Sequence, residues 1–172
     1  ALQTIVSRNI QAFDPAVITV GSFHGGSASN IIPNEVEIVV GIRSFDPTTR
    51  DFIEKRITEI ANFQAESFSM AASVNYERSY DATVNHTAET NFLRIQAVQF
   101  AGVEKVTDLD QPRMGSEDFT YMLQACPGAY IQLGIGPGPG LHHPEYDFND
   151  EAIPAGCSWW AEIVERRLPL AS

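Results

Sequence analysis

The stretch EVEIVVGIRSF, residues 35–45, alternates between two sets of side chains in the way that is typical of a β-strand. One set is entirely apolar and consists of Val36, Ile38, Val40 and Ile42. Arg43 belongs to the other set, so it projects from the face opposite the apolar one, where it can meet a ligand or a partner. Asp46 and Pro47 follow directly and predict a helix start, with Asp46 as the N-cap and Pro47 at the first helical position.

Further helices and strands can be predicted outward from this strand. Residues 47–68 place apolar side chains at helical spacing, residues 16–23 are rich in β-branched side chains, and residues 73–80 alternate again. At the start of the chain, Leu2 and Ile5 share one face of a helix that has no cap before it. The expected order is helix, strand, strand, helix, strand, which is a βαββαβ unit without its first strand. We therefore expect the chain to be a piece of something longer.

Beyond a junction at residues 81–85, the order of the elements changes. A helix is expected at 88–101, ended by Gly102, and another at 152–168. Strands that alternate with helices are typical of an α/β layer fold. The remaining elements are short strands expected at 105–107 and 129–134. The inward face of the last helix is expected to consist of Ile153, Cys157, Ala161, Val164 and Leu168.

The composition argues against several classes of protein. With 44% hydrophobic residues, the 172-residue chain can bury enough apolar surface to fold. Its formal net charge is −11 and its largest basic cluster is the pair Arg166 and Arg167, so neither nucleic acid nor an anionic membrane is an expected partner. No apolar run approaches the ~18 residues typical of a membrane span. The two cysteines are expected to be reduced and packed, which fits a cytoplasmic protein.

His24 belongs to the first group of residues suited to chemistry. Gly25 and Gly26 follow it and leave its side chain little steric cover, while Asn30 adds a neutral donor and acceptor. A purely structural turn would need the glycines but not the imidazole. Histidines also cap loops, however, so a structural role for His24 stays open.

A second group lies in LHHPEYDFND, residues 141–150, between the segment GIGPGPG and the last helix. Loops that lead from a strand into a helix often hold catalytic groups in α/β folds. Because His142 and His143 are adjacent, only one of them is expected to be a metal ligand, with nearby carboxylates supporting it. The alternative is that Asp150 caps the last helix and both histidines lie in solvent.

A third group is MGSEDF, residues 114–119. Ser116 as an N-cap, with Glu117 and Asp118 in the first turn, is ordinary chemistry for a helix start, because acidic groups there interact favourably with the helix dipole. The residues alone therefore favour a structural interpretation of this group, and the sequence predicts a short helix capped by Ser116.

Together these segments resemble the metal-dependent aminoacylase/carboxypeptidase family, especially its branch of hippurate hydrolases and auxin-conjugate hydrolases. The matching pieces are LQTIVSRN, VGSFHGGSASNIIP, GIRSFDP, MGSEDF, PGAYIQLG and LHHPEYDFNDEA. They occur in the family's order and cover nearly the whole chain. No single one of them would carry the resemblance.

The resemblance implies an α/β fold in two parts. Residues 1–84 would form most of a ferredoxin-like dimerisation domain, the lid, without its first strand and the start of its first helix. Residues 85–172 would form the C-terminal part of a zinc-peptidase-like catalytic domain. The whole enzyme would be a homodimer that binds two divalent metal ions, zinc or manganese, in each subunit. Most of the metal ligands and the general base would lie outside this chain, which would be inactive alone.

The resemblance also assigns roles to individual residues. His142 corresponds to the family's C-terminal metal ligand, and His143 is its neighbour. His24 corresponds to a histidine of the dimerisation domain that reaches the active site of the other subunit and stabilises the oxyanion. Asn30 and Arg43 correspond to residues that hold the substrate, and a guanidinium suits a carboxylate because it binds it bidentately. Glu117 and Asp118 would lie close to the active site, and the resemblance assigns them no role.

The function that follows is hydrolysis of the amide bond of N-acyl amino acids, such as hippurate-like substrates, in the cytoplasm. One alternative is a carboxypeptidase or dipeptidase of the same family, acting on short peptides. Another is a non-catalytic relative, used for dimerisation or ligand binding, that has lost its metals. The presence of His24, Arg43 and His142 argues against this last alternative.

Overall fold

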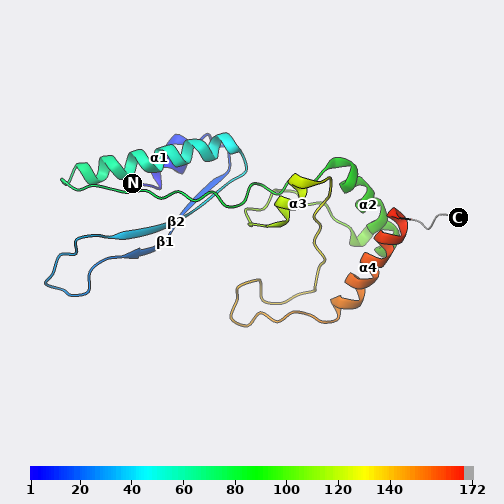
Figure 1. Cartoon of the computed structure of the whole chain (residues 1–172). Coiled ribbons are helices and arrows are strands. Elements are labelled where there is room, and N and C mark those ends of the chain that lie inside the picture. Colours follow the sequence, from blue (N-terminus) through cyan, green and yellow to red (C-terminus); the bar gives the residue numbers. More distant parts are fainter. Residues whose placement is uncertain (169–172) are drawn as a thin grey trace. The chain divides into compact units, whose positions relative to one another are not determined.

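The computed structural model of the chain describes residues 1–168, which divide into two compact units (Figure 1). Unit 1 contains residues 1–82 and 112–120, and unit 2 contains, among the described residues, 83–111 and 121–168. Helices are present in both units and a small β-sheet in unit 1, so the fold is mixed α/β, as the sequence predicts.

Unit 1 is built from a β-hairpin, a long helix and a short opening turn. β1 (Ala16–His24) and β2 (Glu37–Ser44) pair antiparallel, and α1 (Pro47–Glu66) and the π-helical turn η1 (Ile5–Asn9) pack against them (Figure 1). The positions expected for both strands and for the long helix are confirmed. The apolar faces of all four elements meet in one core, whose buried members are Ile5, Ile18, Ile53 and Ile57.

α1 begins where the sequence predicts because Asp46 caps it. The Asp46 carboxylate accepts hydrogen bonds from the Thr48 hydroxyl and from the Thr49 backbone N–H, the latter at 2.7 Å. These hydrogen bonds, that from Thr48 above all, lower the pKa of Asp46. Pro47 occupies the first turn, where an N–H would have no partner within the helix. A helix that starts at a fixed residue presents Ile53 to the core in a fixed orientation.

Replacing Ile53 by alanine should lower the free energy of unfolding by about 3 kcal/mol, because this side chain is fully buried and its loss leaves a cavity. Urea unfolding of the wild type and the variant would measure the difference. Ile32→Ala is a matched control, since the Ile32 side chain is 91% exposed and its removal should change stability by less than about 0.5 kcal/mol. Equal effects of the two substitutions would contradict the central place of Ile53 in the core.

Residues 73–80 do not form the expected third strand. The alternation is present in their burial, since Val74 and Tyr76 pack against the core of unit 1 while the residues between and beside them are exposed. Burial also raises the pKa of the Tyr76 hydroxyl. Within residues 1–168, however, the sheet consists of β1 and β2, and residues 73–80 are not one of its strands. An alternating pattern therefore identified the buried side chains correctly but not the backbone pairing.

Ion pairs fasten this segment to α1, alongside which it runs in Figure 1. Arg78 bridges two carboxylates on the helix, Asp51 at 2.7 Å and Glu54 one turn further on. Arg50 of the helix pairs with Asp81 at 2.6 Å. Side chains thus hold the segment in place, whereas a strand would be held by its backbone.

A β-bulge changes which face the end of β1 presents. The pairing register shifts between Val20 and Ser22, so that Gly21 is an extra residue on β1. Because side chains alternate along a strand, an extra residue moves every following side chain to the opposite face. His24 is therefore on the face opposite Ile18, whereas unbroken alternation would have placed both on the core side.

Unit 2 contains two helices that pack together. α2 (Thr87–Ala101) ends at Gly102, whose φ of 89° lies in the left-handed region that favours glycine. α4 (Ala152–Arg167) contacts α2, where the rings of Phe100 and Trp159 meet edge to face with their centroids 5.8 Å apart. The positions predicted for both helices, and the glycine that ends the first, are confirmed.

The two short strands expected in the second half are not formed by the described residues. The strand expected at 105–107 is absent, and a 3₁₀ turn, η2 (Val103–Lys105), ends at the first of these residues. Residues 129–134 are not part of a strand. Instead, the Asn85 side chain takes the place of one: its amide donates to the Tyr130 carbonyl at 2.9 Å and accepts from the Tyr130 N–H at 2.7 Å. Hydrogen bonds from a side-chain amide to a distant backbone group cannot be predicted from local sequence patterns.

The short helix predicted after MGSEDF exists but starts later than expected. It is α3 (Phe119–Ala125), and Ser116 is not its N-cap. The Glu117 carboxylate instead accepts a hydrogen bond from the Phe119 N–H at 3.2 Å. An acidic side chain thus satisfies a backbone donor at the helix start, which is the task that the sequence had assigned to the serine.

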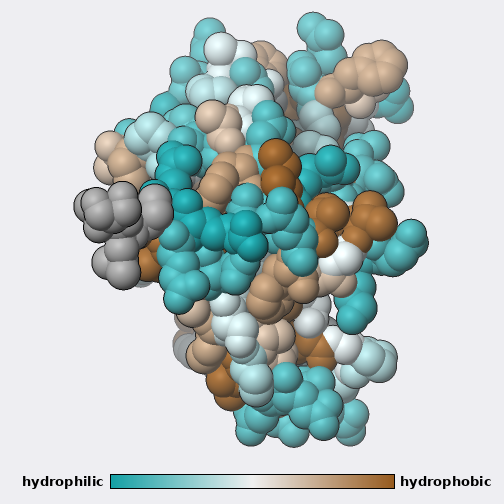
Figure 2. Space-filling view, turned by 90° about the vertical axis from the view of Figure 1, so that its right-hand side faces the viewer, coloured by the Kyte–Doolittle hydropathy of each residue, from teal (hydrophilic) through white to brown (hydrophobic). Residues whose placement is uncertain are grey.

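The stripe predicted to face inward on α4 is exposed, which corrects the sequence-based expectation. The opposite side of the helix faces inward, with Trp159 buried and Gly156 close to the Leu133 side chain. Because both sides of this helix are apolar, periodicity alone cannot choose between them. Figure 2 shows hydrophobic residues exposed among hydrophilic ones on the face that it views. The exposed set, called the α4 stripe below, consists of Ile153, Cys157, Trp160, Val164 and Leu168.

The cysteines differ from the expectation in one respect. Cys126 and Cys157 are both free thiols, as predicted, but both are exposed and not packed. Cys157 is exposed because it belongs to the α4 stripe. The Cys126 thiol follows α3 and contacts the Met122 carbonyl at 3.5 Å. Neither thiol contributes to the core of its unit.

Candidate functional site

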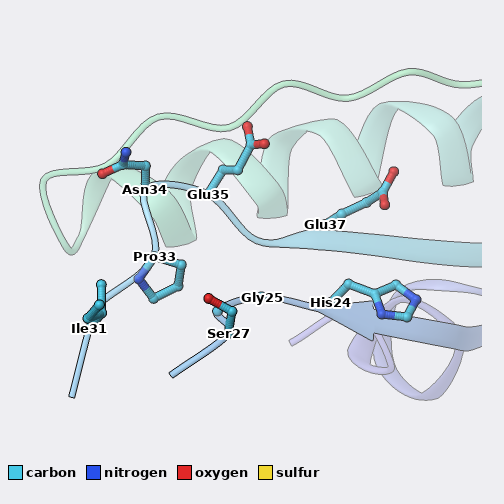
Figure 3. A pocket seen from close by; sticks show the side chains of 9 residues that line it. His24, Gly25, Ser27, Ile31, Pro33, Asn34, Glu35 and Glu37 are labelled. Atoms are coloured by element: carbon cyan, nitrogen blue, oxygen red, sulfur yellow. The ribbon is translucent and has the colours of Figure 1, made fainter. Parts of the chain in front are cut away.

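An open depression of about 420 Å³ lies where β1 and β2 run into their connecting loop (Figure 3). His24, the last residue of β1, and Glu37, the first of β2, line one end of it. The rest of the lining comes from the loop, namely Gly25, Gly26, Ser27, Ile31, Pro33, Asn34 and Glu35. The lining thus contains one imidazole and two carboxylates, and no lysine or arginine. The depression is open, and polar and apolar groups share its lining.

The His24 side chain is exposed and reaches this depression because of the bulge in β1. Gly25 leaves the space beside it open to the Val36 side chain, which comes within 2.8 Å of where a Cβ on residue 25 would be. A larger residue at position 25 would therefore collide with the other side of the loop. The glycine after His24 serves the close approach of the loop's two sides, as well as giving the histidine little cover.

The structure does not bring the other two predicted residues of unit 1 to the same place. Asn30 is exposed in the loop but does not line the depression. Arg43 lies on the same face of the hairpin as His24, since it pairs with Val17 on the side opposite Ile18. It is separated from the level of Glu37 by most of the length of β2, about 20 Å at 3.3 Å per residue. His24 and Arg43 therefore share a face but not a pocket.

Arg43 contacts the MGSEDF segment. Its guanidinium donates a hydrogen bond to the backbone carbonyl of Met114. The same segment is anchored a few residues later, where the hydroxyl of Thr120, which is 1% exposed, donates to the Ala82 carbonyl at 3.2 Å. The sequence indicated neither contact. The acidic residues 117–118 thus lie between two contacts that join this segment to the rest of unit 1.

His142 and His143 lie in a loop of unit 2 whose ends are tied together. The Asn149 side chain donates to the Ile135 carbonyl at 2.9 Å and accepts from the Glu151 N–H at 3.1 Å. Loops of this length with joined ends form compact surface structures that often carry function. The alternative for this loop is wrong in one part and confirmed in the other. Asp150 does not cap the last helix, because the residue at the N-cap position is Glu151 and no side chain caps α4. Both histidines are exposed to solvent, as the alternative expected.

The two histidines of this loop differ in their surroundings. The Nδ1 atom of His143 accepts a hydrogen bond from the Glu145 N–H at 3.1 Å, and its carbonyl accepts one from Tyr146 at 2.9 Å, so His143 builds the turn. His142 has a φ of 68°, in the left-handed region that is uncommon for residues other than glycine. Backbone strain of this kind is frequent at ligand-binding positions. The difference favours His142 over His143 as the residue available to a ligand.

A metal centre is not formed by the described residues on their own. Among residues 1–168, no three histidine, cysteine, aspartate or glutamate side chains are grouped so that they could hold a metal ion. A divalent ion such as zinc needs at least three protein ligands in most sites. His142 could supply one of them, so the donor set present in this chain does not fit a complete metal site.

Reasoning from the sequence missed two features of the His24 region. One is the bulge at Gly21, and the other is Glu37 opposite His24 at the end of the ladder. A glycine inside a strand pattern is a weak signal for a bulge and was the only trace in the sequence. The pairing of His24 with Glu37 depends on the bulge, so no sequence pattern could have predicted it.

Within residues 1–168, no helix combines the length and the apolar character that crossing a membrane requires. The hairpin with its helix and the helical second unit define a mixed α/β protein with a histidine in each unit at an open loop. Comparison with known families then identifies the class: residues 7–166 match the model of peptidase family M20/M25/M40, and the chain belongs to this family.

The relatives agree with the branch that the sequence resembles. The IAA-amino acid hydrolase ILR1-like 4 of Arabidopsis thaliana is 33% identical over 98% of this chain and 40% of its own length. The hippurate hydrolase of Campylobacter jejuni is 30% identical over 98% of this chain and 44% of its own length. The chain thus spans less than half the length of these relatives.

A solved structure confirms the fold. The Bacillus subtilis YXEP protein, a dinuclear metal-binding peptidase of the M20 family, superposes with a TM-score of 0.74 over 98% of this chain and 45% of that protein. The two sequences are 20% identical, so the likeness concerns the fold alone. The arrangement described above is therefore that of part of an M20-family chain.

Proposed function

We propose that this chain is part of an amidohydrolase that cleaves the amide bond of N-acyl amino acids. The observation that carries the proposal is the family match over residues 7–166, together with relatives named for hydrolysing a hippurate and an indole-acetyl amino acid conjugate. The exposed imidazole of His24 in an open depression supports it, because a donor at such a position can stabilise negative charge that develops on a carbonyl oxygen.

The proposal gives each predicted residue a task. His24 donates a hydrogen bond to the oxyanion, Arg43 binds the free carboxylate of the substrate, and Asn30 helps to hold it. To bind the substrate carboxylate, the Arg43 guanidinium must release the Met114 carbonyl. A carboxylate would displace this neutral acceptor, because charge-assisted hydrogen bonds are stronger. The chain corresponds to a lid domain, residues 1–84, and the C-terminal part of a catalytic domain, residues 85–172.

We further propose that the whole enzyme is a cytoplasmic homodimer that uses two divalent metal ions per subunit, zinc or manganese. His142 is the one residue of this chain that we expect among the ligands, since its loop position and φ of 68° leave it exposed and apart from the turn that His143 builds. A bound metal would supply Lewis acidity. The other donors would belong to parts of the protein beyond this chain.

The test uses the full-length protein and compares three amides: N-benzoylglycine, an indole-acetyl amino acid and an unblocked dipeptide. We expect release of the free amino acid from the two N-acyl compounds and much slower cleavage of the dipeptide. Removing metal with a chelator should abolish the activity, and adding zinc or manganese should restore it. Preference for the dipeptide would favour the alternative of a dipeptidase. Hydrolysis of none of the three, with metal bound, would contradict the proposal.

A further inference from the structure

His24 and Glu37 form the last pair of the β1–β2 ladder. Their Cα atoms are directly opposite each other, and both side chains line the depression at the loop (Figure 3). Side chains of directly opposite residues point to the same face of a hairpin, with Cβ atoms about 4.5–5.5 Å apart. At that separation a glutamate carboxylate can reach an imidazole by rotation about its own side-chain bonds.

The bulge at Gly21 creates this pair. Without the extra residue, His24 would be opposite Val36, and both would lie on the core face of the hairpin. With it, the histidine is opposite a carboxylate on the other face. Bulges are frequent next to active sites, where they re-aim a side chain. One extra residue in β1 therefore decides both where the imidazole points and which neighbour it has.

We propose that Glu37 is a positioning residue for His24. The inference rests on the proposed function, since it concerns how His24 is held while it faces the substrate. In this structure the two side chains are not hydrogen-bonded to each other, and rotation of the Glu37 side chain would bring its carboxylate to one ring N–H of His24 (Figure 3). This hydrogen bond fixes the ring plane. The opposite edge of the ring then faces the depression, where it donates to the oxyanion in the imidazolium form, in which both ring nitrogens carry protons. An imidazole at the end of a hairpin has little packing to hold it, because His24 and Glu37 are both exposed.

Arginine and lysine are absent from the lining, so no basic side chain there competes for the Glu37 carboxylate. Glu35, two residues earlier on the same side, is the other carboxylate of the depression. It lies beyond the ladder and has no cross-strand partner there. The pairing geometry therefore singles out Glu37, whereas the net charge of the depression would not distinguish the two glutamates.

A double-mutant cycle in the full-length protein tests the proposal. Glu37→Gln should lower kcat about tenfold with KM changed less than about twofold, because the ring loses its orientation and not its contacts with bound substrate. In the His24→Ala background, Glu37→Gln should cause no further loss. Glu37→Asp, which keeps the carboxylate, should restore part of the activity. Glu66→Gln on α1 is the control, as it makes the same charge change away from the depression and should leave kcat unchanged.

A second measurement separates this inference from the proposed function. Imidazole ¹H–¹⁵N spectra of the full-length protein report which ring nitrogens of His24 carry protons, with or without catalysis. Glu37→Gln should change the His24 signals, and Glu66→Gln should not. Unchanged His24 signals, additive losses in the cycle, or an equal effect of Glu35→Gln would overturn the pairing even if the protein hydrolyses amides. If it hydrolyses none but the signals respond, the proposed function fails and the pair stands.

Discussion

In the full-length protein, His24→Ala is expected to lower kcat for N-acyl amino acid hydrolysis by about 100–1000-fold, the loss typical of removing one oxyanion donor. The metal content should stay unchanged, because His24 lies in the hairpin pocket of unit 1 while the proposed ligand His142 belongs to unit 2. Steady-state kinetics and metal analysis of the same preparation would measure both quantities.

Phe23→Ala is the matched control for this prediction. Phe23 is the neighbour of His24 on β1, but it pairs with Ile38 and so lies on the opposite face of the hairpin. Its side chain is already 65% exposed, so its removal should not disturb the fold. We expect kcat of this variant to stay within about twofold of the wild type. Loss of metal in His24→Ala would show that its role is misassigned, and equal losses in both variants would show that the hairpin as a whole matters, not the imidazole.

The second large effect is expected for His142→Ala. Loss of a group that only hydrogen-bonds to a metal ligand lowers metal affinity about 10–100-fold, and His142→Ala should lower it by more than that. The reason is that a ligand is removed outright, and His143 is a poor replacement, because its Nδ1 atom accepts from the Glu145 N–H and the proton of the neutral ring is then on Nε2. Titration of metal into chelator-treated protein, followed by mass spectrometry or calorimetry, gives the affinity directly and does not depend on activity.

His143→Ala is the control in the same loop. It should loosen the turn, because the Glu145 N–H loses its side-chain acceptor, but leave metal affinity within about tenfold of the wild type, as expected for a group that only supports a ligand. If His143→Ala costs more metal affinity than His142→Ala, the two assignments must be exchanged. If neither variant changes the affinity, this loop supplies no ligand and the metal site lies elsewhere in the protein.

The elements that local sequence determines were predictable. Asp46 and Pro47 fixed the start of α1, Gly102 fixed the end of α2, and the alternation in residues 37–44 fixed β2, because caps, left-handed glycines and period-two patterns act within a few residues. The apolar faces of these elements also identified the core around Ile53. The candidate residues His24 and His142 were found through their loop settings, and both are exposed in loops or at strand ends.

Features that depend on a neighbour in space were not predictable. The segment around Val74 has the alternation of a strand but is not a strand of the sheet, so its burial was right and its backbone pairing wrong. The Asn85 side chain forms hydrogen bonds with the backbone N–H and carbonyl of Tyr130, and the two residues are 45 positions apart in the sequence, so no local pattern indicates this contact. The residue opposite His24 on β2 depends on whether Gly21 pairs with β2 or bulges out of the ladder. Each of these choices is made by tertiary contacts, which override local preference.

The α4 stripe has a consequence for how the chain behaves in solution. Its large side chains, Ile153, Trp160, Val164 and Leu168, are between 49% and 71% exposed, and contiguous apolar surface of this kind attracts other apolar surfaces. The formal charge of −11 opposes the approach of identical copies, but this repulsion acts over only about 8 Å at physiological ionic strength. Self-association should therefore depend on salt. Raising the ionic strength screens the electrostatic repulsion between copies and leaves the apolar attraction in place, so the isolated chain should then self-associate through this helix.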